Sequence, residues 1–291
     1  MKCFICGEKQ FKCVHKGTRD VPTINVMKCC NCGFIQLDNR EYNMEENYMG
    51  GGMLRDAYAA ISDKTEYMEW EVWRQETVWD DNRRYDMLKE ICTGKDVLEF
   101  GCGNGGFLKR IKGVAKNVAG IELMDEAREN IAREGIEVYK TLDSIDKKYD
   151  IVCTFMVIEH LNNPEEIIRK VSNILIDGGT LICETPNLQD ALISKYRCAA
   201  FEDFTYWSKH VVLFSSATLE RLMVRNGFVT SSNTQIQRYS LANHLYWLSE
   251  GKPGGHMKWT EFNEKELNDR YAEKLIEEGI ADTLWYVGTK Q

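Results

Sequence analysis

The stretch VLEFGCGNGGFL, residues 97–108, joins an apolar run to a cluster of glycines and decides how the chain folds. Two glycine patterns overlap in it and share Gly101 and Gly103. One is GxGxxG, and the other is ExGxGxG, which begins at Glu99 and ends at Gly105. In both patterns a strand ends, the glycines let the backbone turn sharply, and a nucleotide-containing cofactor lies against the next helix start. The stretch therefore predicts the first strand of an α/β sheet with a cofactor site at its end.

Strand-like and helix-like segments alternate after this loop. The strand-like segments are residues 96–101, 117–122, 137–141, 149–157 and 179–186. Such alternation predicts a parallel sheet with helices on both faces. Ligands of such sheets bind beyond the carboxyl ends of the strands.

Glu99 distinguishes the two glycine patterns. Dinucleotide-binding loops usually carry an apolar residue at this position, because a carboxylate beside a diphosphate is unfavourable. S-adenosylmethionine (SAM) instead presents a cationic ammonium and a sulfonium, which an acidic residue suits. Glu122, at the end of the second strand, can accept hydrogen bonds from ribose hydroxyls in either class. Glu99 therefore favours SAM as the cofactor.

Six of the eleven cysteines lie in the first 32 residues. They include two CxxCG units, CFICG from Cys3 to Gly7 and CCNCG with Cys29 and Cys32 as its spaced pair. Each unit can fold as a tight turn that brings two thiolates to one point, and four sulfurs complete a tetrahedron around zinc. A redox dithiol would require a βαβ context, which this segment lacks. We therefore predict a zinc ribbon with structural Zn²⁺ on these four cysteines.

Composition narrows the class of protein. The net charge of −8 and pI near 5.3 disfavour a broad nucleic-acid interface. No apolar run approaches the ~18 residues of a membrane span, and the opening MKCFICGEKQ has no uninterrupted apolar core. We expect a cytoplasmic protein that contacts neither membrane nor nucleic acid; the oligomeric state stays open.

Several segments resemble class I SAM-dependent methyltransferases, especially the branch of the ubiquinone-biosynthesis O-methyltransferases. They are VLEFGCGNGGFL, GIELMDEA, YDIVCTFMVIEHLNNPEEIIRKVSNILIDGGTLICETPN and HVVLFSSATLERLMVRNGF. The cysteine-rich front and the later ENYM resemble the zinc-binding head of sugar C-methyltransferases. The resemblance implies a seven-stranded Rossmann-like sheet whose last strand, residues 282–290, lies antiparallel beside the fifth.

The resemblance also implies cofactor contacts. They fall on Glu99, Gly101, Cys102, Gly103, Gly105 and Glu122, with Leu123 against the adenine and Phe155 or Met156 near the methionyl moiety. Asp143, after the third strand, reaches the adenine amino group in this interpretation. As an alternative, Asp143 is a solvated loop residue.

Two histidines are candidate catalytic residues. A hydroxyl nucleophile must lose its proton, so a base near the methyl group of the cofactor would help. His160 follows the fourth strand, and His210 lies after the fifth, where resembling proteins line the substrate pocket. The alternative for each is a packed histidine.

A catalytic metal is not expected. Some related O-methyltransferases hold a divalent metal with a Glu-x-x-Glu-His unit and a later histidine. Met156 stands at the first glutamate position here, which removes a charged oxygen ligand. Glu159, His160 and His210 would be the remaining ligands.

Residues 238–259 form an aromatic, histidine-bearing insertion before the last strand. Aromatic faces and amides suit a sugar or nucleotide-linked substrate, so we predict substrate contacts here. The candidates are Arg238, Tyr239, Asn243 and His244. The alternative is a helical cover whose side chains only pack.

The sequence predicts three parts of the chain and one leading function. We predict a zinc ribbon over 1–45, a helical connector and lid over 46–92, and a methyltransferase domain over 93–291 with a helical insertion at 241–281. Apolar and aromatic residues of the connector recur at helical spacing and are expected to face the core, among them Tyr67, Val78, Trp79, Leu88 and Ile91. The leading hypothesis is O-methylation of a carbohydrate or nucleotide-linked small molecule. Alternatives are C-methylation of a nucleotide-linked keto-sugar, RNA methylation, and a non-catalytic binding module.

Overall fold

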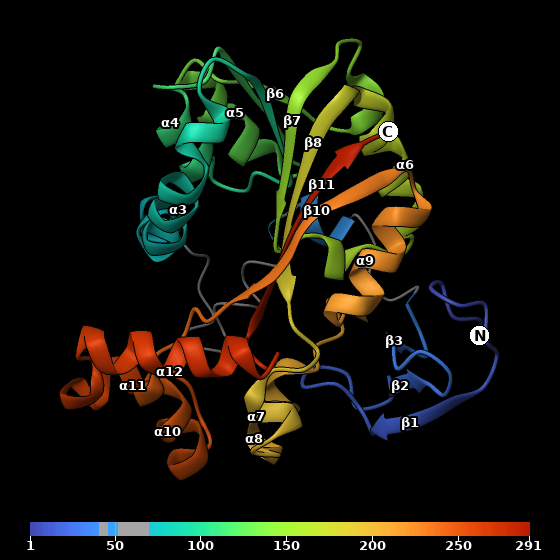
Figure 1. Cartoon of the computed structure of the whole chain (residues 1–291), viewed down its shortest axis with the longest axis vertical. Helices are drawn as coiled ribbons and strands as arrows, with labels where there is room; N and C mark the ends of the chain where they lie inside the picture. Colours follow the sequence, from blue (N-terminus) through green and yellow to red (C-terminus); the bar gives the residue numbers. More distant parts are fainter. Residues whose placement is uncertain (41–45, 50, 52–69) are drawn as a thin grey trace.

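The computed structural model describes residues 1–40, 46–49, 51 and 70–291 (Figure 1). Its main sheet has seven strands in the order β10-β11-β8-β7-β4-β5-β6. Their bounds are β4 Asp96–Phe100, β5 Asn117–Ile121, β6 Glu137–Tyr139, β7 Tyr149–Phe155, β8 Leu175–Pro186, β10 Phe228–Ile236 and β11 Thr283–Lys290. Strands β4 to β8 pair in parallel, and β11 lies antiparallel between β8 and β10. The predicted α/β fold and the antiparallel last strand are confirmed.

Helices cover both faces of this sheet (Figure 1). One face carries α3 Trp70–Cys92, α4 Gly106–Ile111 and α5 Asp125–Arg133, and the other carries α6 Pro164–Ile174 and α9 Ser216–Arg225. Successive strand residues point to opposite faces. Val97 of β4 accordingly packs in the core under α3 and α4, and Leu98 packs in the core under α6 and α9. The sheet therefore has one apolar core on each face.

Short elements complete the chain. Several of the helices gather beyond one end of the sheet (Figure 1). The bounds are α1 Glu46–Met49, η1 Leu142–Ser144, η2 Ile158–His160, α7 Ala191–Ser194, α8 Ala199–Thr205, α10 Leu241–Glu250, α11 Gly255–Lys258, η3 Thr260–Phe262 and α12 Lys265–Glu277.

The cysteine-rich front forms a second, small sheet. Strands β1 Phe11–His15, β2 Val26–Cys29 and β3 Ile35–Leu37 pair antiparallel, and β9 Val212–Leu213 adds to β3 as a fourth strand. Its apolar side chains belong to the same core cluster as those under α6 and α9. We call residues 1–40 the zinc head. β9, which is distant in the sequence, therefore completes the sheet of the zinc head. The domain boundary at residue 45 stays a prediction.

Helix α3 differs from the expectation that its apolar residues face the core. Leu88 is buried, but Val78, Trp79 and Ile91 are exposed, with 57% of Trp79 accessible. The inward face of the helix instead carries charged side chains, among them the buried Asp81 and Arg84. Tyr67, included in the same expectation, lies outside the described residues.

A buried ion-pair cluster attaches α3 to the sheet. Arg84 Nε and Arg83 Nη2 donate to the carboxylate of Glu184 on β8, at 2.8 and 2.7 Å. Asp80 accepts hydrogen bonds from Arg83 and from Arg238, which follows β10. Burial alone raises the pKa of Glu184, but the charges of Arg84 and Arg83 hold this pKa below its usual range. Three separate segments thus meet around one carboxylate.

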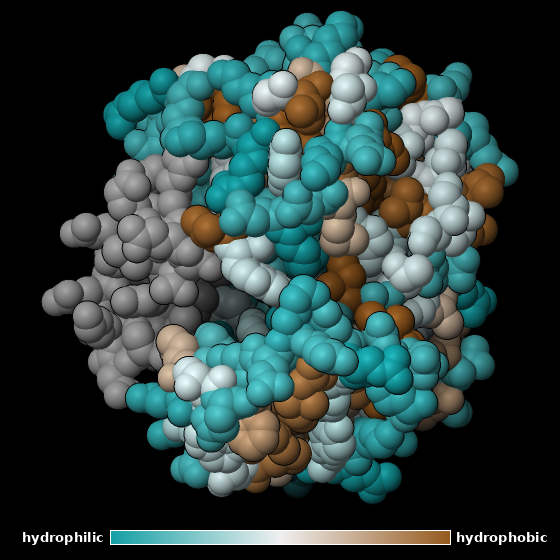
Figure 2. Space-filling model, turned by 60° about the vertical axis from the view of Figure 1, so that its left-hand side comes forward, coloured by the Kyte–Doolittle hydropathy of each residue, from teal (hydrophilic) through white to brown (hydrophobic). Residues whose placement is uncertain are grey.

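The surface of the molecule is mixed. Figure 2 shows polar residues over most of one face, with apolar residues in small groups among them. Within the described ranges, no helix has both the length and the apolar character needed to cross a bilayer.

Glu184→Gln should destabilise the fold strongly, because it keeps the side-chain shape but removes the buried negative charge that pairs with both Arg84 and Arg83. We expect a loss of about 3–5 kcal/mol in the free energy of unfolding, measured by chemical denaturation. The control is Asp86→Asn on the same helix, which removes the exposed Lys89 pair and should cost about 0–1 kcal/mol. Equal losses in the two variants would contradict the role of Glu184.

Candidate functional site

A cavity of about 1120 Å³ opens at the carboxyl ends of β4, β5 and β7. Residues of the loops that follow these three strands form much of its wall, as the parallel topology requires. The predicted cofactor residues on this wall are Glu99, Gly101, Cys102, Gly103, Glu122, Leu123, Asp143, Phe155 and Met156.

The glycine loop turns through the left-handed backbone region. Gly101, Gly103 and Gly105 have φ values of 76°, 54° and 70°. A Cβ atom at Gly101 would lie 2.4 Å from a methyl carbon of Val157, so both conformation and space require glycine there. Gly105 is the N-cap residue of α4. The turn leaves backbone amides at a helix start beside the cavity, where a cofactor can approach closely.

Glu99, the second-last residue of β4, places a buried carboxylate on the cavity wall. Only 4% of the residue is accessible, and among the described residues its Oε2 atom has no hydrogen-bond partner. Burial raises the pKa of Glu99 well above its usual range, although the charge of Arg84 opposes this effect. A buried acceptor of this kind fits a cationic or N–H donor group of a ligand, such as the SAM ammonium.

Glu122 connects the end of β5 to the glycine loop. Its Oε2 accepts from the Gly103 amide and its Oε1 accepts from the Met124 amide, each at 2.9 Å. Burial raises the pKa of Glu122. This carboxylate therefore fixes the loop and also lies where the hydroxyls of a ribose can reach an acidic group.

The cavity wall after β7 is built by Phe155 and Met156. Phe155 stacks on Trp285 with ring centroids 6.0 Å apart, and the Arg84 guanidinium lies over its ring. Met156 has a φ of 55°, which non-glycine residues rarely adopt, and its amide donates to the Glu184 carbonyl. At the other side, Asp143 accepts from Lys170. These three predicted residues therefore line the cavity, and their contacts with a cofactor stay a prediction.

His160 lines the cavity from η2, next to the buried Glu159. Its Nδ1 donates to the Lys209 carbonyl at 2.8 Å, which leaves the lone pair on Nε2. Glu159 Oε1 lies 3.9 Å from that Nε2, and Thr185 donates to the other carboxylate oxygen. Burial raises the pKa of Glu159 to about 7 and lowers the pKa of His160 to about 4. The imidazole is therefore neutral near pH 7.

His210 reaches the cavity only through His160. The two rings lie 4.9 Å apart, but His210 is not among the described residues on the cavity wall. Ligand atoms of Glu159, His160 and His210 lie within 4.8 Å of one another, so this group could hold a metal ion. The expectation that no catalytic metal is present stays a prediction.

The insertion contributes one of its four predicted substrate residues to the described cavity wall. Arg238 lines the cavity and pairs with Asp80, whereas Tyr239, Asn243 and His244 do not appear on that wall. Asn243 accepts from the Gly254 amide, and His244 bonds to Tyr271 and Gln237. These contacts lie within the insertion and its flanks, as in the helical-cover alternative. A substrate role for the three stays a prediction.

Sequence reasoning missed the contribution of α3 to the cavity. Thr77, Asp80, Asp81 and Arg84 of this helix lie on its wall. Thr77 donates to Asp81 and accepts from the Asn104 amide group in the glycine loop. The available signal was the charged pair DD followed by RR at helical spacing, which places opposite charges on one face.

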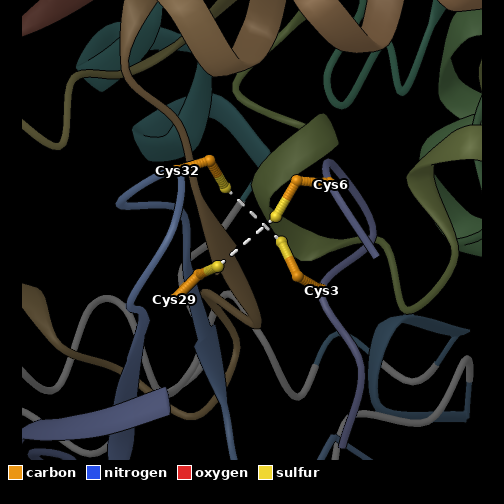
Figure 3. A group of neighbouring side chains, drawn as sticks. All are labelled: Cys3, Cys6, Cys29 and Cys32. Carbon is orange, nitrogen blue, oxygen red and sulfur yellow. Dashed lines mark hydrogen bonds between the residues drawn. The ribbon is translucent and has the colours of Figure 1, made fainter. Parts of the chain in front are cut away.

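The four predicted zinc ligands converge in the head, where their side chains point toward one another (Figure 3). The sulfurs of Cys3 and Cys32 lie 3.6 Å apart, and those of Cys6 and Cys29 lie 3.5 Å apart. Sulfurs about 2.3 Å from a tetrahedral zinc would be roughly 3.8 Å apart, so the cluster fits this metal.

Zinc removal should unfold the head, because the bound metal supplies much of the folding energy of such small sites. We expect about one zinc per chain by elemental analysis, and loss of zinc with a lower Tm in Cys32→Ser. Cys30→Ser, which changes an exposed thiol outside the cluster, should keep both the zinc and the Tm. Full zinc content in Cys32→Ser would contradict the assignment.

Gly101→Ala should abolish high-affinity SAM binding, because the added methyl group collides with Val157 and moves the loop. Titration calorimetry should show a Kd at least about tenfold weaker, equivalent to ~1.4 kcal/mol. Gly94→Ala is the matched control: Gly94 has a similar φ of 69°, but its Cβ would meet nothing within 4 Å. An unchanged Kd in Gly101→Ala would show that SAM does not use this loop.

Comparisons with known proteins agree with this geometry. A family model described as "Methyltransferase domain" matches residues 67–233. A protein of Mycolicibacterium smegmatis named a probable S-adenosylmethionine-dependent methyltransferase is 36% identical over 110 residues, which cover 35% of this chain and 42% of the relative. A ubiquinone biosynthesis O-methyltransferase of Shewanella pealeana is 28% identical over 105 residues, covering 32% and 44%. The chain thus matches less than half the length of these two relatives.

A solved structure has a similar fold. A chain from the complex between the Haloferax volcanii Trm112 methyltransferase activator and a methyltransferase has a TM-score of 0.52 and 16% identity, covering 76% of this chain and 96% of its own length. At this identity the likeness concerns the fold alone. The family match, together with the glycine loop, the acidic strand ends and the seven-stranded sheet, shows that the chain belongs to the class I SAM-dependent methyltransferases.

Proposed function

We propose that this chain transfers the methyl group of SAM to a hydroxyl oxygen of a small molecule, a carbohydrate or a nucleotide-linked metabolite. One observation carries the proposal: a single cavity is lined by the glycine loop, by Glu99, whose Oε2 has no hydrogen-bond partner among the described residues, and by His160 with a fixed tautomer. The proposed cofactor site and the proposed proton acceptor thus lie on the same cavity.

The proposed cofactor site uses the residues at the strand ends. Glu99 would bind the ammonium, Glu122 the ribose hydroxyls, and Leu123 the adenine, while Phe155 and Met156 would enclose the methionyl part. Gly101, Cys102, Gly103 and Gly105 would provide the close backbone approach, and Asp143 would reach the adenine amino group. When bound, SAM supplies a methyl group on a positively charged sulfur.

The proposed role of His160 is to accept the hydroxyl proton of the acceptor. Because Nδ1–H is held by the Lys209 carbonyl, Nε2 is the atom that takes the proton. The Glu159 carboxylate, 3.9 Å from Nε2, would stabilise the resulting imidazolium. His210, packed on the His160 ring, would hold it in place, and its direct catalytic role stays a prediction.

Polar groups near His160 support a hydroxyl-rich acceptor. Asn162 and Asn163 follow His160 closely in the sequence and line the same cavity. Amide donors suit sugar hydroxyls and phosphate oxygens. The resemblance of the head to sugar C-methyltransferases keeps carbon methylation of a keto-sugar as a second candidate. A cytoplasmic location stays a prediction from the sequence.

The function is tested by incubating the protein with methyl-labelled SAM and a panel of sugars and nucleotide sugars. Mass spectrometry of the product should place the label on a hydroxyl oxygen. Label on a ring carbon would support the second candidate and overturn O-methylation. Methylation of RNA but no small molecule would overturn both.

His160→Gln should lower kcat by about 10²–10⁴, because general base catalysis typically contributes this factor. The Kd for SAM should stay unchanged, since His160 is assigned to the acceptor. His256→Gln replaces an exposed histidine of the insertion and should retain full activity. A kcat within twofold of the parent protein in His160→Gln would remove His160 from the mechanism.

A further inference from the structure

We infer that the zinc head positions the histidine side of the cavity, so that zinc binding orders the acceptor site while leaving the SAM site untouched. The inference concerns the loop of residues 203–213, which carries His210 and the carbonyl that holds His160. That this side of the cavity binds the acceptor rests on the proposed function. The contacts between the zinc head and residues 203–213 do not depend on it.

The loop is joined to the head by backbone pairing. Gln36 and Ile35 of β3 pair antiparallel with Val212 and Leu213 of β9, immediately after His210. The Leu37 amide also donates to the Val211 carbonyl at 3.0 Å. The end of the loop is therefore an edge strand of the head sheet, and its register depends on β3.

Arg19 and Asp20 of the head hold the start of the loop. The Arg19 amide donates to the Tyr206 carbonyl at 2.8 Å, and its guanidinium donates to the Phe204 carbonyl. Asp20 accepts from both the amide and the hydroxyl of Ser208, at 3.0 and 2.5 Å. Burial raises the pKa of Asp20, but the Ser208 hydrogen bonds bring it below its usual value. Such charge-assisted pairs are the strong ones.

Between these attachments lie the groups that fix the histidines. The Lys209 carbonyl accepts from His160 Nδ1, and Lys209 follows the Asp20-bound Ser208 directly. Trp207 packs edge-on against His160 and His210, while the Arg19 guanidinium lies 4.3 Å from the Trp207 ring centroid. A shift of the head by an ångström would therefore change the orientation of both imidazoles.

The zinc cluster lies at the base of the same head strands. Cys29 ends β2, and Cys32 lies at the end of the turn between β2 and β3, which pairs with β9. The opposite wall of the cavity differs: no hydrogen bond between described residues joins the head to the glycine loop or to Glu122. Loss of zinc should therefore disturb only the cavity wall that carries His160.

Hydrogen–deuterium exchange of the full chain, read by mass spectrometry with and without a zinc chelator, tests this division. Chelation should speed amide exchange about tenfold or more in residues 203–213 as well as in the head. Exchange in residues 96–122 should stay the same, as should the Kd for SAM measured by calorimetry. Faster exchange confined to residues 1–40 would overturn the inference.

A variant with zinc still bound separates positioning from unfolding of the head. Asp20→Ala removes the Ser208 hydrogen bonds, so exchange in 203–213 should rise about tenfold or more at full zinc content. Asp20→Asn should recover part of the protection, because its amide oxygen still accepts. The matched control is Asp38→Ala, since Asp38 accepts only from Asn25 within the head among the described contacts; its exchange in 203–213 should be unchanged. Identical exchange in Asp20→Ala and Asp38→Ala would contradict the positioning role.

The experiments can contradict the proposed function and the positioning role of the zinc head independently of each other. If SAM does not bind, but chelation still speeds exchange in 203–213, the proposed function is wrong and the positioning holds. If labelled methyl transfer is observed, and chelation leaves both exchange in 203–213 and the KM for the acceptor unchanged, the positioning is wrong. If both proposals are correct, Asp20→Ala should lower kcat/KM for the acceptor while the Kd for SAM stays constant.

Discussion

The site depends on a carboxylate that is buried at the end of the first parallel strand. Glu99 is deeply buried, which raises its pKa against the opposing charge of Arg84, and one of its oxygens lacks a partner among the described residues. Arg84 is in turn fixed by Glu184 of β8, and Glu184 also binds Arg83. Strand ends, α3 and cofactor loop are therefore coupled through electrostatics in a buried environment, where such interactions are strong.

The two walls of the cavity are organised by different means. The wall proposed for SAM is largely local in sequence, because Gly101 and Glu122 lie in loops that directly follow their own strands. The histidine wall is assembled from distant parts of the sequence: η2, the loop of residues 203–213 and the zinc head. A metal that stabilises a small ribbon can in this way support a site that the metal does not contact.

The sequence predicted what depends on local pattern and spacing. The glycine loop, the strand ends at Glu99 and Glu122 and the four cysteines all follow from short motifs. The place of the last strand beside the fifth was instead implied by the family resemblance. The addition of β9 to the head sheet was not predicted, because a two-residue strand has no periodicity and its partner lies far away in sequence. Trp79 was expected to face the core and is exposed, because ion pairs occupy the inner face of α3. Asn243 and His244 carried chemistry-bearing groups, but their hydrogen bonds lie within the insertion and its flanks.

The most direct measurement is a crystal structure of the protein with S-adenosylhomocysteine. The account predicts the ligand in the cavity, with its amino group at the Glu99 carboxylate and its ribose at Glu122, and with His160 facing the position of the missing methyl group. A ligand bound elsewhere, or a ribose with no contact to Glu122, would contradict the account.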